Sequence, residues 1–371
     1  MKNVKSTLLP LFAALLLATA LSSCNPSPKS RDLPRSEPSA ELENAMAAYL
    51  EKVQGTLSDT IPFLRQEIHS IMIVKDGKVV QEKYLRTTPE EPHVLFSVSK
   101  TFTATAVGLA ISEGKLSLSD KLIDFFPDYL PADLGENLPK VTVEHLLTMT
   151  CGHDVDPTGA VLRYKPEEGE EPLNWARYFL SHPFVHEPGT FYCYNTIGTY
   201  MLSAIVQKVT GEKIVDYLTP RLFEPLGIDK PRWDESPQGI NAGGFGLYLR
   251  TEDMAKMGQL FLQKGRWRGK QVLPKDWVGA ASSFKVPCVP AGMRPDSAAA
   301  AGLTKENSDW VQGYGYQMWM CRHGAYRADG ANGQYIIVCP EQNAVIAVTA
   351  DLMDMQREIN DIWDILLPAL R

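Results

Sequence analysis

The chain has 371 residues, of which 44% are hydrophobic and 22% are charged, and its formal net charge is −7 at neutral pH. This length and composition suffice for one large core or two moderate lobes and exclude a wholly disordered chain. The mild acidity, without a basic block, argues against a nucleic-acid partner.

Residues 1–23 have the organisation of a signal peptide, with two lysines, an apolar stretch and then small residues. We favour this over a membrane-spanning helix because the apolar stretch is shorter than the roughly 20 residues that such a helix needs. The sequence Leu21-Ser-Ser-Cys24 resembles the bacterial lipobox, which implies a lipid on Cys24 as the new N-terminus. Loss of Lys2 and Lys5, with no acid, would change the charge from −7 to −9.

The resemblance to a lipobox predicts a lipoprotein of the bacterial cell envelope, on the periplasmic side or the surface. Asn25 is not the aspartate associated with inner-membrane retention in enterobacteria, so we expect the outer membrane. Residues 24–40 are rich in proline and serine without an apolar period, which predicts a flexible tether between the lipid and a folded body over 41–371.

The folded body begins with apolar residues at helical spacing over 40–55, which predicts a helix. Residues 69–85 form two runs in which apolar and polar residues alternate, joined by Asp76-Gly77, and this pattern predicts a β-hairpin. Residues 101–115, 142–150, 196–211 and 251–265 each carry the apolar spacing of a helix, and several end at glycine.

The last part of the chain contains two or three strand-like runs over 326–352 and an amphipathic helix over 355–371. Both ends of the chain therefore supply a helix and antiparallel strands. We predict an α/β (α+β) architecture with an α/β lobe of about 41–100 and 310–371 and an inserted, mainly helical lobe of about 101–309. The cleft between the lobes is the default place for a site.

Five cysteines follow Cys24, an odd number that cannot all pair within one chain, and we interpret them as buried small hydrophobes, with one disulfide left open: Cys151, Cys193, Cys288, Cys321 and Cys339. No pair has zinc-like CxxC spacing. His182 and His186 stand four apart, but Pro183 breaks the helical spacing, and we predict no metal site.

Ser-x-x-Lys occurs three times, at Ser97, Ser112 and Ser282, so the pattern alone indicates little. Ser97 differs because an apolar run precedes it and a long apolar helix follows. Ser97 and Lys100 near a helix start can project from one face, with the hydroxyl within reach of the amine. The alternative is that Ser97 only caps the helix and Lys100 is solvated.

The Ser97-x-x-Lys100 element resembles that of the serine β-lactamase and penicillin-binding protein superfamily. Ordered stretches such as "GKLSLSDKLIDFFPDYLP", "VTVEHLLTMTCGHD" and "PGTFYCYNTIGTYMLSAIV" extend the resemblance over about residues 60–360. It is closest to class C-like serine hydrolases, the esterases and relatives of 6-aminohexanoate-dimer hydrolase. The resemblance implies a β-lactamase/transpeptidase-like fold.

The second catalytic element of this family, Tyr-x-Asn or Tyr-x-Ser, falls on Tyr194, with Asn195 one residue early and Thr196 in third place. The resemblance implies that Tyr194 moves protons with Lys100 and that Asn195 contacts substrate; Tyr192 competes for the tyrosine role. His153 and Asp154 are expected near the cleft, without a chemical step.

The third element, Lys-Thr-Gly or His-x-Gly in the family, falls on Ala328-Asp329-Gly330, where no cation stands first. That cation helps bind a substrate carboxylate, so its absence makes recognition of β-lactams or D-Ala-D-Ala peptides less favourable. Gly330, Ala331 and Gly333 are predicted to lie against substrate, with a tight turn as the alternative for the two glycines.

We therefore predict a hydrolase that cleaves an ester or amide bond through a Ser97 acyl-enzyme, without a cofactor, on a small-molecule or peptide substrate. The alternatives are a β-lactamase or D-amino-acid peptidase of the same fold, or a non-catalytic lipoprotein that uses the cleft as a receptor. The retained nucleophile and lysine favour the enzyme.

Overall fold

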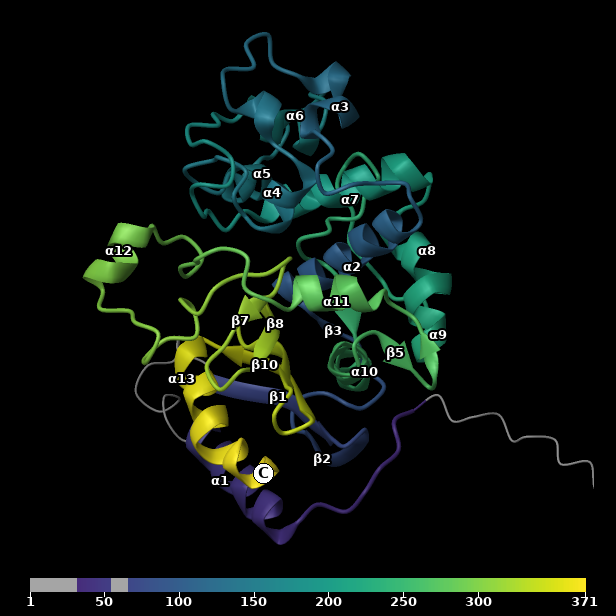
Figure 1. Cartoon of the computed structure of the whole chain (residues 1–371), viewed down its shortest axis with the longest axis vertical. Coiled ribbons are helices and arrows are strands. Elements are labelled where there is room, and N and C mark those ends of the chain that lie inside the picture. The colour runs from purple at the N-terminus through teal and green to yellow at the C-terminus, as the bar shows by residue number, and fades with distance from the viewer. Residues whose placement is uncertain (1–31, 55–65) are drawn as a thin grey trace, which may run out of the picture. The chain divides into compact units, whose positions relative to one another are not determined.

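The computed structural model describes residues 32–54 and 66–371, and the predicted signal peptide and Cys24 lie outside these ranges. The described chain combines a six-stranded antiparallel sheet with helices on both of its faces (Figure 1). The predicted fold class is confirmed.

The strands are β1 (Gln66–Lys75), β2 (Lys78–Tyr84), β3 (His93–Val94), β4 (Tyr248–Leu249), β5 (Arg266–Trp267), β6 (Lys270–Gln271), β7 (Trp319–Met320), β8 (Tyr326–Gly330), β9 (Gln334–Cys339) and β10 (Ala344–Leu352). The α-helices are α1 (Ala40–Gln54), α2 (Ser99–Ser112), α3 (Leu122–Phe125), α4 (Val143–Leu147), α5 (Thr158–Arg163), α6 (Trp175–Ser181), α7 (Thr196–Thr210), α8 (Ile214–Leu218), α9 (Glu224–Leu226), α10 (Thr251–Leu262), α11 (Lys275–Ala281), α12 (Pro295–Ala300) and α13 (Met355–Asp361).

The main sheet has the order β2-β1-β10-β9-β8-β7, so strands from the two ends of the chain pair at its centre. Ile71 of β1 lies opposite Val348 of β10. The predicted hairpin is confirmed, because Asp76 and Gly77 between β1 and β2 have φ angles of +52° and +76°, as the tightest hairpin turns require.

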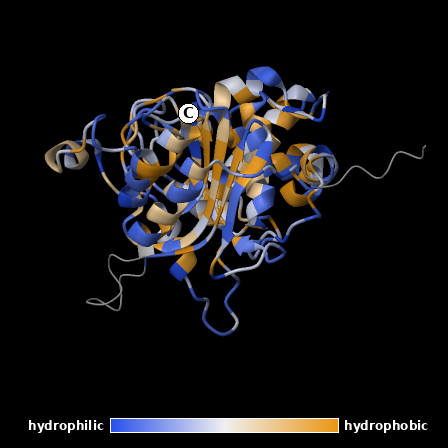
Figure 2. Ribbon diagram, turned by 90° about the horizontal axis from the view of Figure 1, so that it is seen from below, coloured by the Kyte–Doolittle hydropathy of each residue, from blue (hydrophilic) through white to orange (hydrophobic). Residues whose placement is uncertain are grey.

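Both faces of the sheet are covered, since alternate side chains of each strand enter separate cores. Ile71 and Ile73 pack with α1, α13 and the π-helical turn Ile362–Leu366, while Met72 and Val74 enter the core shared with the other helices. Figure 2 shows the hydrophobic strands enclosed between helices. Burial on both faces explains why β10 is apolar almost throughout.

Helix α10 packs on the sheet although its sequence lies within the segment predicted as the helical lobe. A Cβ added at Gly258 would come within 2.4 Å of Val345 and 2.8 Å of Ile336, so glycine permits this close approach. The boundary expected from the sequence placed α10 with the helices, because periodicity shows an apolar face but not its partner.

The other predicted helices form close to their predicted positions. Helix α2 begins two residues before the predicted start, and α7 ends at Gly211, whose φ of +77° is the left-handed C-cap. The predicted C-terminal helix is broken into α13, a π-helical turn and a final 3₁₀ turn over Pro368–Leu370.

Part of the predicted tether is bound to the folded body. The Ser36 N–H donates to the Val79 carbonyl at 2.9 Å, and the Leu33 N–H donates to Glu252. Arg35 also pairs with Glu252. The segment therefore extends the edge of β2, and the prediction of a flexible tether through residue 40 is wrong over Leu33–Ser36.

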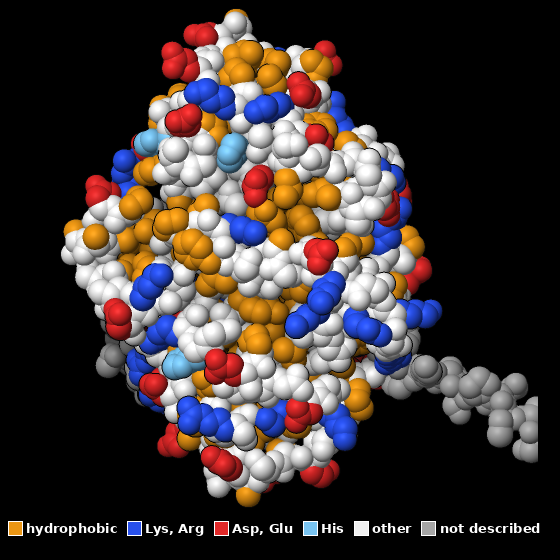
Figure 3. All heavy atoms as spheres, viewed as in Figure 1, with side chains coloured by type: hydrophobic (Ala, Val, Ile, Leu, Met, Phe, Trp, Pro, Cys, Tyr) orange, Lys and Arg blue, Asp and Glu red, His pale blue; other side chains and the backbone are white. Residues whose placement is uncertain are grey.

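The visible face carries charges of both signs scattered among polar and apolar groups (Figure 3). Within residues 32–54 and 66–371, no helix combines the length and apolar character needed to cross a membrane.

Candidate active site

Ser97 lies in a 3₁₀ turn, Phe96–Val98, that leads directly into α2. Phe96 has a φ of +45°, a conformation that is costly for a bulky L-residue. The Ser99 hydroxyl holds the turn by donating to the Phe96 carbonyl at 2.6 Å and accepting from the Leu247 N–H at 3.2 Å. The strained turn leaves Ser97 partly exposed while its neighbours Leu95 and Val98 are buried.

Lys100 sits one helical turn after Ser97, as predicted, and its Nζ donates to the Ser97 Oγ at 2.9 Å. The second acceptor is the Gly244 carbonyl at 2.8 Å. The Lys100 side chain is 1% exposed, so it is not the solvated lysine of the alternative interpretation.

Burial lowers the pKa of Lys100 to about 7, although the carboxylates of Asp156 and Asp329 act to raise it. An amine in a site from which water is largely excluded loses hydration that its charged form needs. A large fraction of Lys100 is therefore neutral near pH 7, the form that accepts a proton.

Tyr194 completes a three-residue cluster with Ser97 and Lys100. The Lys100 Nζ lies 4.8 Å from the centre of the Tyr194 ring. Burial raises the pKa of the Tyr194 phenol, and hydrogen bonding to the Ser97 side chain opposes this increase. The phenol consequently keeps its proton at neutral pH, and the ring is held by stacking on Trp319, with centroids 5.6 Å apart.

Tyr192, the competing tyrosine, points into a different environment. Its ring packs edge-on against Tyr314, with centroids 5.6 Å apart, and its buried hydroxyl has no hydrogen-bond partner. The structure therefore places Tyr194, rather than Tyr192, beside Ser97 and Lys100.

Strand β8 closes the site from the side of the sheet. A Cβ added at Gly330 would lie 2.4 Å from the Leu95 carbonyl oxygen and 3.2 Å from the Val98 nitrogen. Glycine at 330 thus allows the end of β8 to touch the backbone of the turn that carries Ser97. The close approach predicted for this glycine exists, but its partner is the protein backbone.

The other two residues predicted around Gly330 occupy the turn between β8 and β9. Ala331 is exposed, and its carbonyl accepts a hydrogen bond from the Gln334 side chain at 3.1 Å. Gly333 has a φ of +85°, and an added Cβ would meet Glu358 and Leu352 at 2.7 Å. The surroundings of Gly333 match the alternative of a tight turn and give no support to a substrate contact.

Asn195 is 1% exposed and serves as the N-cap of α7, because its Oδ1 accepts from the Gly198 N–H at 2.8 Å. Its Nδ2 donates to the Nδ1 of His153 at 2.9 Å. With both ends of the amide occupied, the predicted substrate contact of Asn195 finds no support. The one-residue offset of this asparagine was the signal, since it moves the amide from the cleft to the helix cap.

His153 and Asp154 lie on different sides of their loop. His153 is fully buried between Phe179 and Phe184, and burial lowers its pKa to about 3, so it stays neutral. Asp154 is partly exposed and accepts from His186 at 2.9 Å.

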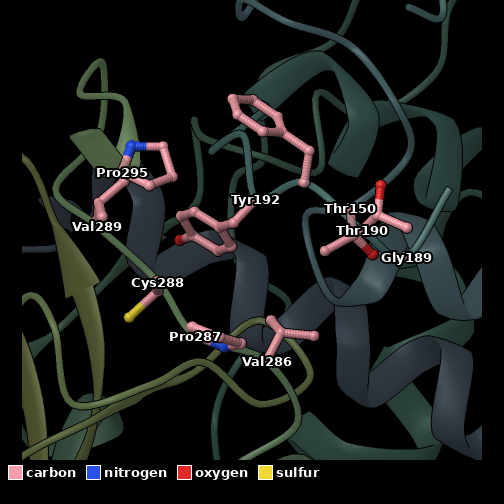
Figure 4. A pocket seen from close by; sticks show the side chains of 10 residues that line it. Thr150, Gly189, Thr190, Tyr192, Val286, Pro287, Cys288, Val289 and Pro295 are labelled. Atoms are coloured by element: carbon pink, nitrogen blue, oxygen red, sulfur yellow. The ribbon is translucent and has the colours of Figure 1, made fainter. Parts of the chain in front are cut away.

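A pocket of about 200 Å³ lies beside the loop that carries Tyr194 (Figure 4). Tyr192, Val286 and Val289 make its wall largely apolar, and its lining includes neither Ser97 nor Lys100. We therefore locate the chemistry by the Ser97 contacts and not by this pocket.

In the part of the chain that the structure describes, no three His, Cys, Asp or Glu side chains are grouped as a metal site would require. The five cysteines there are free thiols, and all except Cys193 are buried, as predicted for small core residues.

Three features of the site were missed by the sequence reasoning: the Gly244 carbonyl under Lys100, the Asp156 carboxylate and the Arg327 guanidinium that pairs with Asp329. Gly244 lies in the glycine-rich sequence Gly243-Gly-Phe-Gly246, and a Cβ at Gly244 would come within 2.7 Å of the Thr196 carbonyl. Asp156 carries no local pattern, since only the fold brings it near Lys100. Arg327 stands two residues before Asp329 in a predicted strand, and this spacing could have indicated the pair.

The chain is similar in sequence to a known hydrolase and in fold to solved structures. A 6-aminohexanoate-dimer hydrolase from Paenarthrobacter ureafaciens is 25% identical over 329 residues, covering 84% of this chain and 77% of that protein. Among solved structures, EstCE1, a hydrolase with promiscuous acyltransferase activity, aligns with a TM-score of 0.65 at 16% identity over 87% of this chain and 99% of its own.

A penicillin-binding protein homologue from Pyrococcus abyssi aligns with a TM-score of 0.60 at 21% identity, covering 84% of this chain and 73% of that chain. Residues 65–369 match the model of the beta-lactamase family. This match begins after α1 and spans the sheet, helices α2 to α13 and the Ser97–Lys100–Tyr194 cluster, and the chain therefore belongs to the beta-lactamase family of hydrolases.

Proposed function

We propose that the protein is a serine hydrolase that cleaves an ester or amide bond through an acyl-enzyme on Ser97. The observation that carries the proposal is the 2.9 Å contact between the Lys100 Nζ and the Ser97 Oγ, on an amine whose pKa is about 7. A serine hydroxyl becomes an effective nucleophile when a neighbouring base takes its proton. The similarity to a 6-aminohexanoate-dimer hydrolase supports the same class of reaction.

In the proposed reaction, neutral Lys100 accepts the Ser97 proton as the oxygen attacks the carbonyl carbon. The resulting oxyanion is stabilised by the backbone N–H of Ser97 and by an N–H at the end of β8, for which Ala331 is our candidate. Tyr194 passes a proton to the departing oxygen or nitrogen. The proton that Lys100 holds then replaces the one that Tyr194 gave up, so that Lys100 is neutral again. Water attacks the acyl-enzyme and loses one proton to Lys100, and this proton passes to the Ser97 Oγ as the acid leaves.

Labelling with a fluorophosphonate probe tests the nucleophile, because the probe forms a stable covalent bond only with an activated serine. We expect the wild-type protein to be labelled and Ser97→Ala to be unlabelled. Ser112→Ala is the matched control, since Ser112 belongs to a second Ser-x-x-Lys sequence but its hydroxyl only donates to the Leu109 carbonyl. Labelling of Ser97→Ala at the wild-type rate would refute the proposal.

The choice between an ester and a β-lactam as substrate is also part of the proposal. We favour measurable turnover of a short p-nitrophenyl ester and little turnover of nitrocefin, because Ala328 stands where the family has a cation. Rapid nitrocefin hydrolysis with no esterase activity would instead favour a β-lactamase.

We further propose that the mature protein is anchored to the bacterial envelope by a lipid on Cys24. The sequence Leu21-Ser-Ser-Cys24 supports this location. Metabolic labelling with a fatty acid, lost in Cys24→Ala, would support the anchor, and unchanged labelling of that variant would contradict it.

A further inference from the structure

Ala328 stands where the family has a cation, and its two neighbours in the sequence, Arg327 and Asp329, form an ion pair. Arg327 and Asp329 are two residues apart in β8, so their side chains lie on the same side of the strand. The Arg327 Nε donates to the Asp329 Oδ2 at 2.8 Å. Arg327 is completely buried, whereas the Asp329 side chain keeps 7% of its exposure. Of the two charged side chains, only that of Asp329 keeps any exposed surface.

Arg327 is also fixed where it stands. Its guanidinium lies 4.5 Å from the centre of the Trp310 ring, and its Nη1 donates to the Asp309 carbonyl at 3.1 Å. The guanidinium also lies 5.5 Å from the centre of the Trp319 ring. Trp319 stacks on Tyr194 and therefore lies between Arg327 and that tyrosine. Arg327 therefore cannot replace the family's cation by turning toward a substrate.

Asp329 stands next to the groups that move protons. It immediately precedes Gly330, whose backbone touches the turn carrying Ser97. Its carboxylate interacts electrostatically with both Lys100 and Tyr194. In the proposed reaction these two groups must face the departing part of the substrate, so Asp329 lies on the leaving-group side.

We propose that Asp329 is a specificity-determining residue that favours leaving groups bearing an ammonium group and disfavours leaving groups bearing a carboxylate. The inference rests on the proposed serine hydrolase function. A buried carboxylate such as that of Asp329 attracts a cation and repels an anion more strongly than an exposed one would, because less water screens the interaction. Asp156, the other carboxylate that interacts with Lys100 and Tyr194, reinforces this preference.

The test uses three aryl acetates that differ only in the para substituent of the phenol: trimethylammonium, carboxamide or carboxylate. The value of kcat/KM for each ester in Asp329→Asn is divided by the wild-type value, so that intrinsic reactivity cancels. Relative to the carboxamide ester, we expect this ratio to fall about five- to tenfold for the cationic ester and to rise by a similar factor for the anionic ester.

Asp329→Asn leaves the Arg327 guanidinium buried without its carboxylate, so a second variant removes both charges by combining Arg327→Gln with Asp329→Asn. Fluorophosphonate labelling of Ser97 shows which variants retain the site.

Equal ratios for the three esters in a labelled variant would overturn the inference while leaving the proposed hydrolase intact. Failure of the wild-type protein to label and to hydrolyse the carboxamide ester would overturn both.

Discussion

The Lys100 Nζ lies 2.9 Å from the Ser97 Oγ and belongs to an amine whose pKa burial lowers to about 7. If Lys100 is the base, only its neutral form is productive, and that fraction increases as pH rises through the pKa. We expect kcat/KM for a neutral ester to rise between pH 5.5 and 8.5 with an inflection near 7, as a pH profile would show.

Lys100→Met should lower kcat/KM by about 100- to 10,000-fold, the range found for removal of a general base. The thermal unfolding temperature of this variant should change little, because removing the cost of burying an amine offsets the loss of its hydrogen bond to the Gly244 carbonyl. A flat profile, or an inflection close to the ordinary lysine pKa of about 10.4, would assign the proton to another group.

The two tyrosines of the site loop offer a direct comparison. Tyr194→Phe removes a hydroxyl that interacts with Ser97, and we expect kcat to fall about 100-fold or more because the leaving group loses its proton donor. Tyr192→Phe removes a buried hydroxyl without a partner, and it should leave kcat within about twofold and the unfolding temperature unchanged or higher. Steady-state kinetics on one ester decides between them, and the reverse order would move the role to Tyr192.

The sequence predicted those parts of the fold that local patterns determine. Asp76-Gly77 located the β1–β2 turn because both residues adopt positive φ, and Gly211 located the end of α7 for the same reason. The place of α10 on the sheet escaped prediction because it depends on which strands meet Gly258, a contact between residues far apart in the chain.

The same distinction applies to the site. The contact between Ser97 and Lys100 was predictable because residues three apart at the start of a helix lie on one face. The position of Tyr194 followed from the resemblance to the Tyr-x-Asn element of the family. Asn195 was assigned to substrate, but its amide caps α7 and binds His153. The left-handed conformation of Phe96 had no signal at all, since the position is not a glycine.

Gly330 tests whether the close approach of β8 to the turn that carries Ser97 contributes to stability and activity. In Gly330→Ala the new methyl group would lie 2.4 Å from the Leu95 carbonyl oxygen, so the strand and the turn must separate. We expect a loss of about 1–3 kcal/mol in the free energy of unfolding and a slower rate of fluorophosphonate labelling, because the oxyanion donors move apart.

Gly279→Ala is the matched control for this substitution. Gly279 lies in α11 with open space around the position of an added Cβ, and its alanine variant should be neutral or more stable by up to about 1 kcal/mol. If Gly330→Ala unfolds and labels like Gly279→Ala, the close approach has no functional role.

Asn195 tests how Tyr194, the tyrosine of the proposed reaction, is positioned, since Asn195 is the next residue and the N-cap of α7. Asn195→Ala removes the cap on the Gly198 N–H and the donor to His153, and we expect it to destabilise the protein by about 2 kcal/mol or more. Asn174→Ala, which removes only the cap of α6 at the Arg177 N–H, should cost about 1 kcal/mol. Denaturant unfolding measures both values.

Asn195→Ala should also lower kcat, because the Tyr194 backbone loses its anchor, whereas Asn174→Ala should not. Equal stability losses and an unchanged kcat would show that the hydrogen bond to His153 contributes nothing beyond the helix cap.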